Sequence, residues 1–538
     1  MRRHGLDRKT SKDFPGGNGR RYVDNLGGCV QSYLLTSSQI FWIIGPFLLY
    51  TIAFGGTLVP KINLIQDLLC RDYYTNLAYT TPGHPYTPIM FGQDDGRCTE
   101  PIIERRAASF LATGSLISGL LSAFTSPFIG EMSDYYGRKT IMIGVVSGSL
   151  VMEVLTVVAA THTDTFNVYW LFLGWFFEGL GGSFIAGMAL TNSYAADTTA
   201  PSRRNVAFGY FHGCLFSGIA LGPLMASYAI RYTHTIAVVF VIALGCHCVF
   251  ILCLAFVIPE SLSKRQQLAA RERRAKQTAG NAMLHRGGEA ARLIRGVMAV
   301  FRPLKALYPK GPGSSAAVRW NLVVLAAIDF TVFGVAMGAM SVVTIYVRKQ
   351  FHWDSAQQSV FISIVNISRV LMLVVVLPLL VRFFRNKKDA QGSTKAKGCD
   401  RLDLNLIRVA VALDTLGFLG YTLARNGEVF TLSGVVASLG GMASPTLQSA
   451  LTKHVPHDRL GQLLGATGLL HAIGRIVSPL IFNGIFAATN DKFRQTVFAC
   501  LAAAFGVALV LTFLLRKGVY WDDEAMDAAE EEEEHDVR

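Results

Sequence analysis

The stretch Gly130-Glu-Met-Ser-Asp134-Tyr-Tyr-Gly137-Arg138-Lys139 separates two long apolar blocks of the sequence. Gly137 permits a tight turn with a positive φ, which residues with a side chain rarely adopt. Asp134 lies near that turn, where a carboxylate can accept backbone N–H groups and stabilise a helix N-terminus. Arg138 and Lys139 can reach carboxylates or helix C-termini on neighbouring elements, and Gly130 lets one helix end close against another. We therefore predict a short, charged loop between two membrane helices.

The apolar blocks on either side of this loop belong to a longer series. Of the 538 residues, 51% are hydrophobic and 16% are charged, and the mean hydropathy is +0.37, a balance typical of a chain solvated by lipid. The blocks are about 20 residues long, enough for a helix to cross about 30 Å of hydrocarbon and too long for barrel strands. We predict an all-α membrane protein with twelve transmembrane helices, near residues 40–60, 107–129, 140–161, 168–194, 206–230, 236–258, 319–346, 357–381, 404–424, 429–450, 461–486 and 494–515.

A long basic segment after the sixth span divides the chain into two halves. Apolar residues at helical spacing between 293 and 304 predict an amphipathic helix within this segment, lying on anionic lipid or against the cytoplasmic ends of helices; a disordered linker is the alternative. The predicted organisation is a cytoplasmic N-terminal tail (1–38), an N-terminal six-helix half (39–258), a cytoplasmic basic linker (259–317), a C-terminal six-helix half (318–516) and an acidic cytoplasmic tail (517–538).

Lysine and arginine are concentrated in alternate connections between the predicted spans. Because positive residues favour the cytoplasmic side of a membrane, this alternation predicts that both termini are cytoplasmic. The net charge of +13 does not indicate nucleic-acid binding, since the charges lie between apolar blocks and form no continuous face. We expect a monomeric multi-pass protein in the plasma membrane or in the membrane of an internal organelle.

The pattern G-x-x-x-D-x-x-G-R-K between the second and third spans resembles the loop motif of the major facilitator superfamily. The broader resemblance covers nearly all twelve spans and implies the major facilitator fold of two six-helix halves. In that family the motif forms a charge latch between the halves that stabilises one access state. The resemblance therefore implies that Gly130, Asp134, Gly137, Arg138 and Lys139 act in the conformational change without touching substrate.

The fifth predicted span holds a second, partial match. Gly218-Ile-Ala-Leu-Gly222-Pro223 resembles the family's G-x-x-x-G-P element, which is common in proton antiporters. Met225 and Ala226 stand where paired glycines usually follow. A Pro-kinked helix packed through small residues explains the same pattern, so both interpretations stay open.

Other stretches depart from the common family pattern. The fourth span often carries an arginine where this chain has Trp175-Phe-Phe-Glu178-Gly179, and the loop motif of the second half is degenerate. These departures argue against a standard drug–proton antiport mechanism. The Ser-Asp-x-x-Gly-Arg-Lys version of the loop and the stretch Cys70-Arg-Asp-Tyr-Tyr74 resemble the proton-coupled folate transporter branch of the family.

Ionisable residues inside the predicted spans are the candidates for proton coupling or substrate binding. A charged side chain at the bilayer centre costs about 2.5–3.5 kcal/mol on insertion scales, so each needs a partner or a watery cavity. Transporters bind substrate and coupling ion near the midplane, between the halves. The candidates are Glu178, His212, Asp329, Arg369, Asp414 and Arg475.

Glu178 is the strongest candidate for a protonatable carboxylate, since the glycines beside it allow close packing; a structural hydrogen bond to a neighbouring helix is the alternative. Asp329 and Arg369 can form an ion pair in the second half. The alternative is that this pair only compensates the cost of burying its two charges. Arg475 can contact an anionic substrate or pair with Asp414. Packing alone is the alternative for Arg475.

Histidine and cysteine side chains supply two further candidates. His212 has an imidazole suited to proton transfer, although a lone histidine on a helix is more often a packing residue. Cys70 and Cys98 share one polar loop on the predicted outer side and can form a disulfide; two free thiols, or one cysteine bridged elsewhere, are the alternatives.

These features predict a secondary transporter that moves a small organic solute across the lipid bilayer by alternating access. We expect the proton as coupling ion, with no cofactor and no metal site. The sequence holds no G-x-x-x-x-G-K-[ST] loop for a nucleotide and no clustered catalytic set, so we do not expect an enzyme. Import by symport fits the folate-transporter-like stretches, and export of drugs or metabolites by antiport fits the span-five element. A non-transporting receptor on a transporter fold is the remaining alternative.

Overall fold

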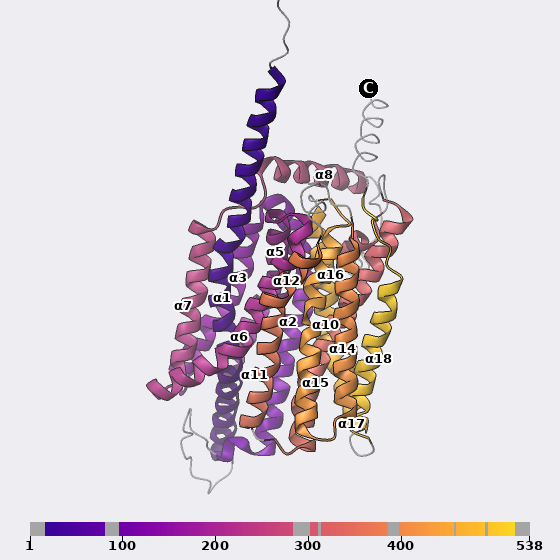
Figure 1. Cartoon of the computed structure of the whole chain (residues 1–538). Helices are drawn as coiled ribbons and strands as arrows, with labels where there is room; N and C mark the ends of the chain where they lie inside the picture. The colour runs from indigo at the N-terminus through magenta and orange to yellow at the C-terminus, as the bar shows by residue number, and fades with distance from the viewer. Residues whose placement is uncertain are drawn as a thin grey trace, which may run out of the picture.

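The computed structural model describes residues 17–80, 96–282, 302–309, 314–353, 355–385, 398–456, 459–489 and 493–521. In these ranges the chain is helical and contains no strand (Figure 1). Twelve helical segments are long and apolar enough to cross a membrane, and they run side by side along one bundle. The predicted fold class is confirmed.

The first half contains six spans built from seven helices. Short 3₁₀ turns at Gly96–Thr99, Val168–Trp170 and Pro201–Arg203 precede the second, fourth and fifth spans, and a π-helical turn at Cys253–Val257 continues the sixth. The helices are α1 (Gly17–Thr80), α2 (Pro101–Tyr136), α3 (Arg138–Thr161), α4 (Leu171–Leu180), α5 (Ser183–Thr198), α6 (Arg204–Thr233) and α7 (Ala237–Leu252).

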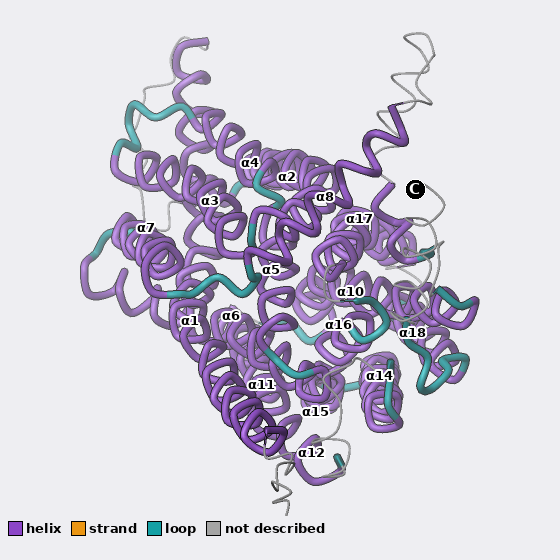
Figure 2. The backbone as a smooth tube through the Cα atoms, turned by 90° about the horizontal axis from the view of Figure 1, so that it is seen from above, coloured by secondary structure: helices purple, strands orange, loops and turns teal. Residues whose placement is uncertain are grey.

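The second half has the same number of spans. A 3₁₀ turn at Arg302–Leu307 precedes it, and a π-helical turn at Met372–Val376 joins the two parts of the eighth span. The helices are α10 (Ala316–Gln350), α11 (Ser355–Leu371), α12 (Leu377–Phe384), α14 (Arg401–Leu423), α15 (Gly427–Leu439), α16 (Ala443–Thr452), α17 (Leu460–Thr489) and α18 (Thr496–Phe513). Seen from the end of the bundle, α6 lies between α1 and α11, so the halves meet along it (Figure 2).

The ends of several predicted spans are wrong. The first span runs over Ile40–Thr80, 41 residues, where the apolar pattern predicts 40–60, and the second covers Pro101–Tyr136. Hydropathy marks the part of a helix that prefers lipid, whereas a helix can continue with polar residues into water.

The fourth and tenth spans are interrupted near their middle, which the sequence analysis does not predict. Gly182 has a φ of +80° and Ser183 a φ of +57°, and they separate α4 from α5. A 3₁₀ turn at Gly440–Met442 separates α15 from α16. The two breaks occupy corresponding positions in the two halves.

A helix that the sequence analysis does not predict follows the sixth span. Helix α8 (Lys264–Ala282) crosses one end of the bundle (Figure 1). The Arg271 Nε donates to the Tyr135 carbonyl at 2.9 Å, and the Arg274 guanidinium lies 4.6 Å from the Tyr135 ring centroid. Most of the amphipathic helix predicted at 293–304 lies outside the described residues.

Cys70 and Cys98 form a disulfide at the opposite end of the bundle from α8. The Cα atoms are 5.3 Å apart, and the Gln66 side chain donates to the Cys98 carbonyl at 2.8 Å. The bridge therefore fixes the end of the first connection, just before α2, against the extended part of α1.

Glycines allow α1 and α6 to pack backbone to backbone. A Cβ on Gly218 would lie 2.2 Å from the Thr51 carbonyl oxygen, and one on Gly222 would lie 2.4 Å from the Gly56 nitrogen. The Thr51 hydroxyl donates across this contact to the Cys214 carbonyl at 2.8 Å. The span-five glycines therefore have a packing role in this structure.

Replacing Gly218 by alanine is expected to lower the midpoint of thermal unfolding of the detergent-purified protein. The added Cβ must push α1 and α6 apart, and overpacking of this kind costs about 1–3 kcal/mol. Gly245→Ala in α7 is the matched control, because a Cβ there meets nothing within 4 Å. Equal midpoints for the two variants would contradict the packing role.

Candidate functional site

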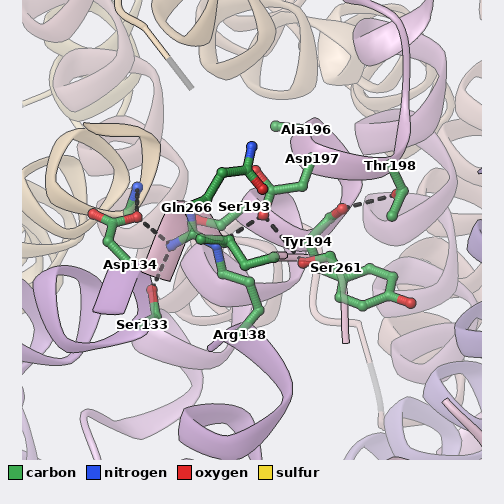
Figure 3. A network of polar contacts seen from close by, with 12 residues as sticks. Ser133, Asp134, Arg138, Ser193, Tyr194, Ala196, Asp197, Thr198, Ser261 and Gln266 are labelled. Carbon is green, nitrogen blue, oxygen red and sulfur yellow. Dashed lines mark hydrogen bonds and ion pairs between the residues drawn. The ribbon is translucent and has the colours of Figure 1, made fainter. Parts of the chain in front are cut away.

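A buried network of charges joins α2, α3 and α5 at the end of the bundle that α8 crosses (Figure 3). Arg138 is fully buried and pairs with Asp134 of α2 at 2.7 Å and with Asp197 of α5 at 2.9 Å. Its Nη1 also donates to the Ser133 hydroxyl at 2.6 Å. Gly137 separates α2 from α3 with a φ of +100°, which favours glycine. The loop motif thus holds one cation between two carboxylates.

Asp134 extends this network to the second half. One carboxylate oxygen accepts from the Gly461 backbone N–H at 3.0 Å and the other from the Gln462 N–H at 2.9 Å. These amides belong to the first turn of α17, so the carboxylate caps a helix N-terminus. Gly130 permits the approach, because a Cβ there would lie 2.4 Å from the Gly461 carbonyl oxygen.

The helix that Asp134 caps is not the one its sequence position suggests. Asp134 still belongs to α2, which ends at Tyr136, and it faces α17 instead of the turn into α3. The first amides of α3, those of Arg138 and Lys139, donate to the two carboxylate oxygens of Glu260 at 2.8 and 3.2 Å. Glu260 is a residue that sequence reasoning missed, since the contact spans 122 residues.

Arg204 makes a second contact between the halves at the same end. This buried arginine begins α6, and it donates to the Thr452 carbonyl at 3.0 Å and to the Ala196 carbonyl at 3.2 Å. Thr452 is the last residue of α16, where carbonyls lack helical partners and carry partial negative charge. Sequence reasoning missed this role, because an arginine at the end of a span is common wherever the positive-inside rule operates.

The second half contains a network of the same form with the charges reversed. Asp403 in the first turn of α14 pairs with Lys453, just after α16, and with Arg385, just after α12. Here a carboxylate lies between two cations. Arg385 also pairs with Asp400 at 3.0 Å. Burial would raise the pKa of Asp400, but the charges of Lys453 and Arg385 lower it below its usual value. The reversal explains why the loop motif of the second half looks degenerate.

Near the middle of the bundle, Ser183 links Glu178 to Arg475. The Ser183 hydroxyl donates to Glu178 Oε1 at 3.0 Å and accepts from Arg475 Nη1 at 3.1 Å. Glu178 and Ser183 flank the break in the fourth span, whereas Arg475 belongs to α17, so these contacts also join the halves. The predicted alternative partner of Arg475, Asp414, does not contact it. We call these three residues the relay.

Asp329 pairs with His471 and not with Arg369, so that predicted pair is wrong. Asp329 Oδ2 and His471 Nε2 are 2.8 Å apart, and the Phe333 ring stacks on the imidazole at 4.2 Å. The reason is the helix arrangement: α10 packs along α17, and touches α11 only slightly. His471 lies one turn before Arg475, which places both on one face of α17.

Arg369 and Asp414 lie beside the break in the tenth span. The Arg369 guanidinium is 4.7 Å from the centroid of Phe216 in α6, a cation–π contact across the halves. The carboxylate whose charge acts on Arg369 is that of Asp414. A Cβ on Gly440 would lie 2.4 Å from the Asp414 carboxyl carbon, and one on Gly441 would lie 2.7 Å from Arg369 Cγ. Glycine at the break thus gives both charged side chains their space.

His212 lies at the boundary between the halves. Its Nδ1 bonds the Phe208 carbonyl at 2.9 Å, and its Nε2 is 3.4 Å from the Ser444 hydroxyl of α16. Asn192 and Gln448 form a buried hydrogen bond across the same boundary. Such uncharged partners carry no signal in the sequence, because serine and amide side chains are frequent in membrane helices. Within the described residues, no group of three or more metal-ligating side chains occurs.

Comparison with known proteins identifies the family to which the chain belongs. The model of the Major Facilitator Superfamily matches residues 86–479. The chain belongs to the major facilitator superfamily. It is 28% identical to the MFS-type transporter avaJ of Aspergillus versicolor, over 88% of each chain. It is also 23% identical to the class C tetracycline resistance protein of Escherichia coli, over 74% of this chain and 85% of that protein. The structure of the human organic anion transporter MFSD10 (TETRAN) superposes with a TM-score of 0.63 at 16% identity, over 89% of this chain and 99% of that one.

Membership of the major facilitator superfamily makes the chain a membrane transport protein. The folate transporter branch, suggested by the two short stretches, receives no support from these comparisons. The contacts of Asp134 and Arg204 at the α8 end, and that of Arg475 with Ser183 in the relay, are therefore contacts between the two halves of a transport protein.

Asp134→Asn is expected to weaken the contact between the halves at the α8 end. The amide keeps one acceptor but loses the charge that pairs with Arg138 and with the helix end, and such charged hydrogen bonds contribute about 1.5–3 kcal/mol. The amides of Gly461 and Gln462 should exchange with deuterium at least about tenfold faster, as measured by mass spectrometry.

Glu131→Gln is the matched control for this measurement. Glu131 lies on the same helix, and its ion pair with Arg274 is long at 4.0 Å and partly exposed. The control should leave exchange in the first turn of α17 unchanged. Unchanged exchange in Asp134→Asn as well would show that the capping contact does not hold the halves together.

Proposed function

We propose that this chain is a proton-coupled secondary transporter that moves a small organic solute by alternating access. The relay carries the proposal, because it joins a carboxylate that can take up a proton to a contact between the halves. The ionised Glu178 accepts a hydrogen bond from the Ser183 hydroxyl, and the serine oxygen in turn accepts one from Arg475. A proton on Glu178 removes the negative charge that orders the hydrogen bonds of the relay, and Arg475 is then free to bind solute.

The interrupted spans support a solute site at the same depth in the membrane as the relay. Transporters place substrate and coupling ions beside discontinuous helices near the midplane, at corresponding positions of their two halves. Here one break adjoins Glu178 and the other adjoins Arg369 and Asp414. Arg369 and Arg475 would attract an anionic group on the solute, so a small organic acid is the solute class that we propose.

Alternating access requires that the α8 end opens and closes. The contacts of Asp134 with α17 and of Arg204 with α16 hold this end together and must break before it opens. The distribution of lysine and arginine supports a cytoplasmic position for this end. A proton-controlled relay at the middle, together with separable contacts at the end, is the minimum that a coupled transporter needs.

Glu178→Gln is expected to abolish proton-driven accumulation while leaving solute exchange intact. The neutral amide imitates a permanently protonated carboxylate, so the pH gradient no longer changes the state of the relay. The solute is first identified by comparing metabolites of cells with and without the protein. Transport is then measured in proteoliposomes, both under a pH gradient and as counterflow without one.

Glu153→Gln is the control, because Glu153 is a buried carboxylate that pairs with Lys61 inside the first half. It should keep proton-driven accumulation. If Glu178→Gln keeps it too, Glu178 has no part in coupling. If no solute in a broad panel moves in the unmodified protein, the transporter proposal fails.

Export by antiport is the second candidate, favoured by the similarity to tetracycline resistance proteins. The sign of the pH gradient distinguishes the two. An acidic exterior accelerates uptake into proteoliposomes by a symporter, and an acidic interior accelerates uptake by an antiporter.

A further inference from the structure

A basic groove opens between α14 and the segment that follows α18, far from the relay. Its volume is about 290 Å³. Three of its lining residues are cations and none is acidic; the full lining is Arg401, Leu404, Asn405, Arg408, Leu515 and Lys517. The groove lies at the same end of the bundle as the charge networks, since Arg401 begins α14 and Lys517 follows the last span.

The polar residues of α14 that line the groove are arranged on one helix face. Arg401, Asn405 and Arg408 are spaced by four and three residues, which aligns their side chains along the axis. The Arg408 guanidinium lies 4.8 Å from the Phe513 ring centroid, and its Nη2 donates to the Thr512 carbonyl at 3.5 Å. Its buried Nε has no hydrogen-bond partner. The Arg408 guanidinium therefore has hydrogen-bonding capacity that the protein itself does not use.

The backbone that carries Lys517 is held on both sides. The Asn321 side chain donates to the Arg516 carbonyl at 2.8 Å and accepts from the Arg516 N–H at 3.0 Å. The Gly518 N–H donates to the Cys399 carbonyl at 3.0 Å. The backbone of Lys517 is thus held beside the groove before any ligand arrives, which lowers the entropy cost of binding.

The nearest carboxylates do not neutralise these cations. Asp403 pairs with Lys453 and Arg385, and Asp400 pairs with Arg385. The groove therefore keeps its positive charge, although acidic residues occur in the same turn of α14.

An apolar surface continues from the groove along the two helices. Large side chains there are more than half exposed: Val409 and Leu416 on α14, and Val507, Val510 and Phe513 on α18. A soluble phosphate compound has no apolar part to pack against this surface, whereas the acyl chains of a lipid would lie along it. Basic pockets between helices at the cytoplasmic side bind anionic headgroups by this combination of charge and apolar surface.

We propose that the groove binds the phosphate headgroup of an anionic glycerophospholipid. Arg401 and Lys517 attract the headgroup at the surface, and Arg408 donates to the phosphate at the base of the groove. The bound lipid joins α14 to the end of α18. The site is independent of the solute site, so it can exist whether or not the proposed function is correct.

The test measures binding of dioctanoyl phosphatidylserine to the purified protein in detergent by native mass spectrometry. Dioctanoyl phosphatidylcholine and glycerol 3-phosphate serve as the zwitterionic and the soluble probe. We expect phosphatidylserine to bind at least tenfold more tightly than either. Arg401→Gln and Lys517→Gln, both at exposed positions, should each weaken it about fivefold, and Arg408→Gln at least as much.

Arg382→Gln is the matched control, since it removes an exposed cation at the same end of the bundle, outside the groove. It should bind phosphatidylserine as the unmodified protein does. Equal binding of the two phospholipids, equal weakening by Arg382→Gln, or unchanged binding in both Arg401→Gln and Lys517→Gln would overturn the proposal. Equally tight binding of glycerol 3-phosphate would assign the groove to a soluble phosphate compound and overturn the lipid assignment.

Discussion

The contact of Asp134 with the first amides of α17 is the interaction on which the arrangement of the two halves depends. A carboxylate at a helix N-terminus contributes about 0.3–2 kcal/mol. That range can favour one arrangement without making it permanent, as a protein that alternates between two states requires. Arg138 makes the arrangement more specific, because removing either carboxylate would leave a buried cation with fewer partners.

The two halves do not contribute equally to this contact. Asp134 and Arg204 both belong to the first half, and both bind backbone groups of the second. In the second half, Arg385 occupies the position that corresponds to Asp134, and a cation is unfavourable at a helix N-terminus. The charge reversal therefore restricts helix capping to one direction, and the reversed network serves to hold the second half together internally.

The sequence predicts the number and approximate position of the spans well, because an apolar block of this length can cross a membrane only as a helix. It also predicts the loop motif and the ionisable residues of the middle. It does not predict their partners, because Asp329 and His471 are 142 residues apart and their pairing depends on which helices become neighbours. The breaks at Gly182 and Gly440 were visible only as glycine pairs, which equally suggest close helix packing. Ser183, the centre of the relay, has no distinguishing feature in the sequence.

The disulfide between Cys70 and Cys98 lies at the end of the bundle opposite the charge networks. Disulfides form and persist in oxidising compartments and are rare where glutathione keeps thiols reduced. The bridge therefore supplies an argument, independent of lysine and arginine counts, for the orientation that we propose, with this end of the bundle facing the oxidising side.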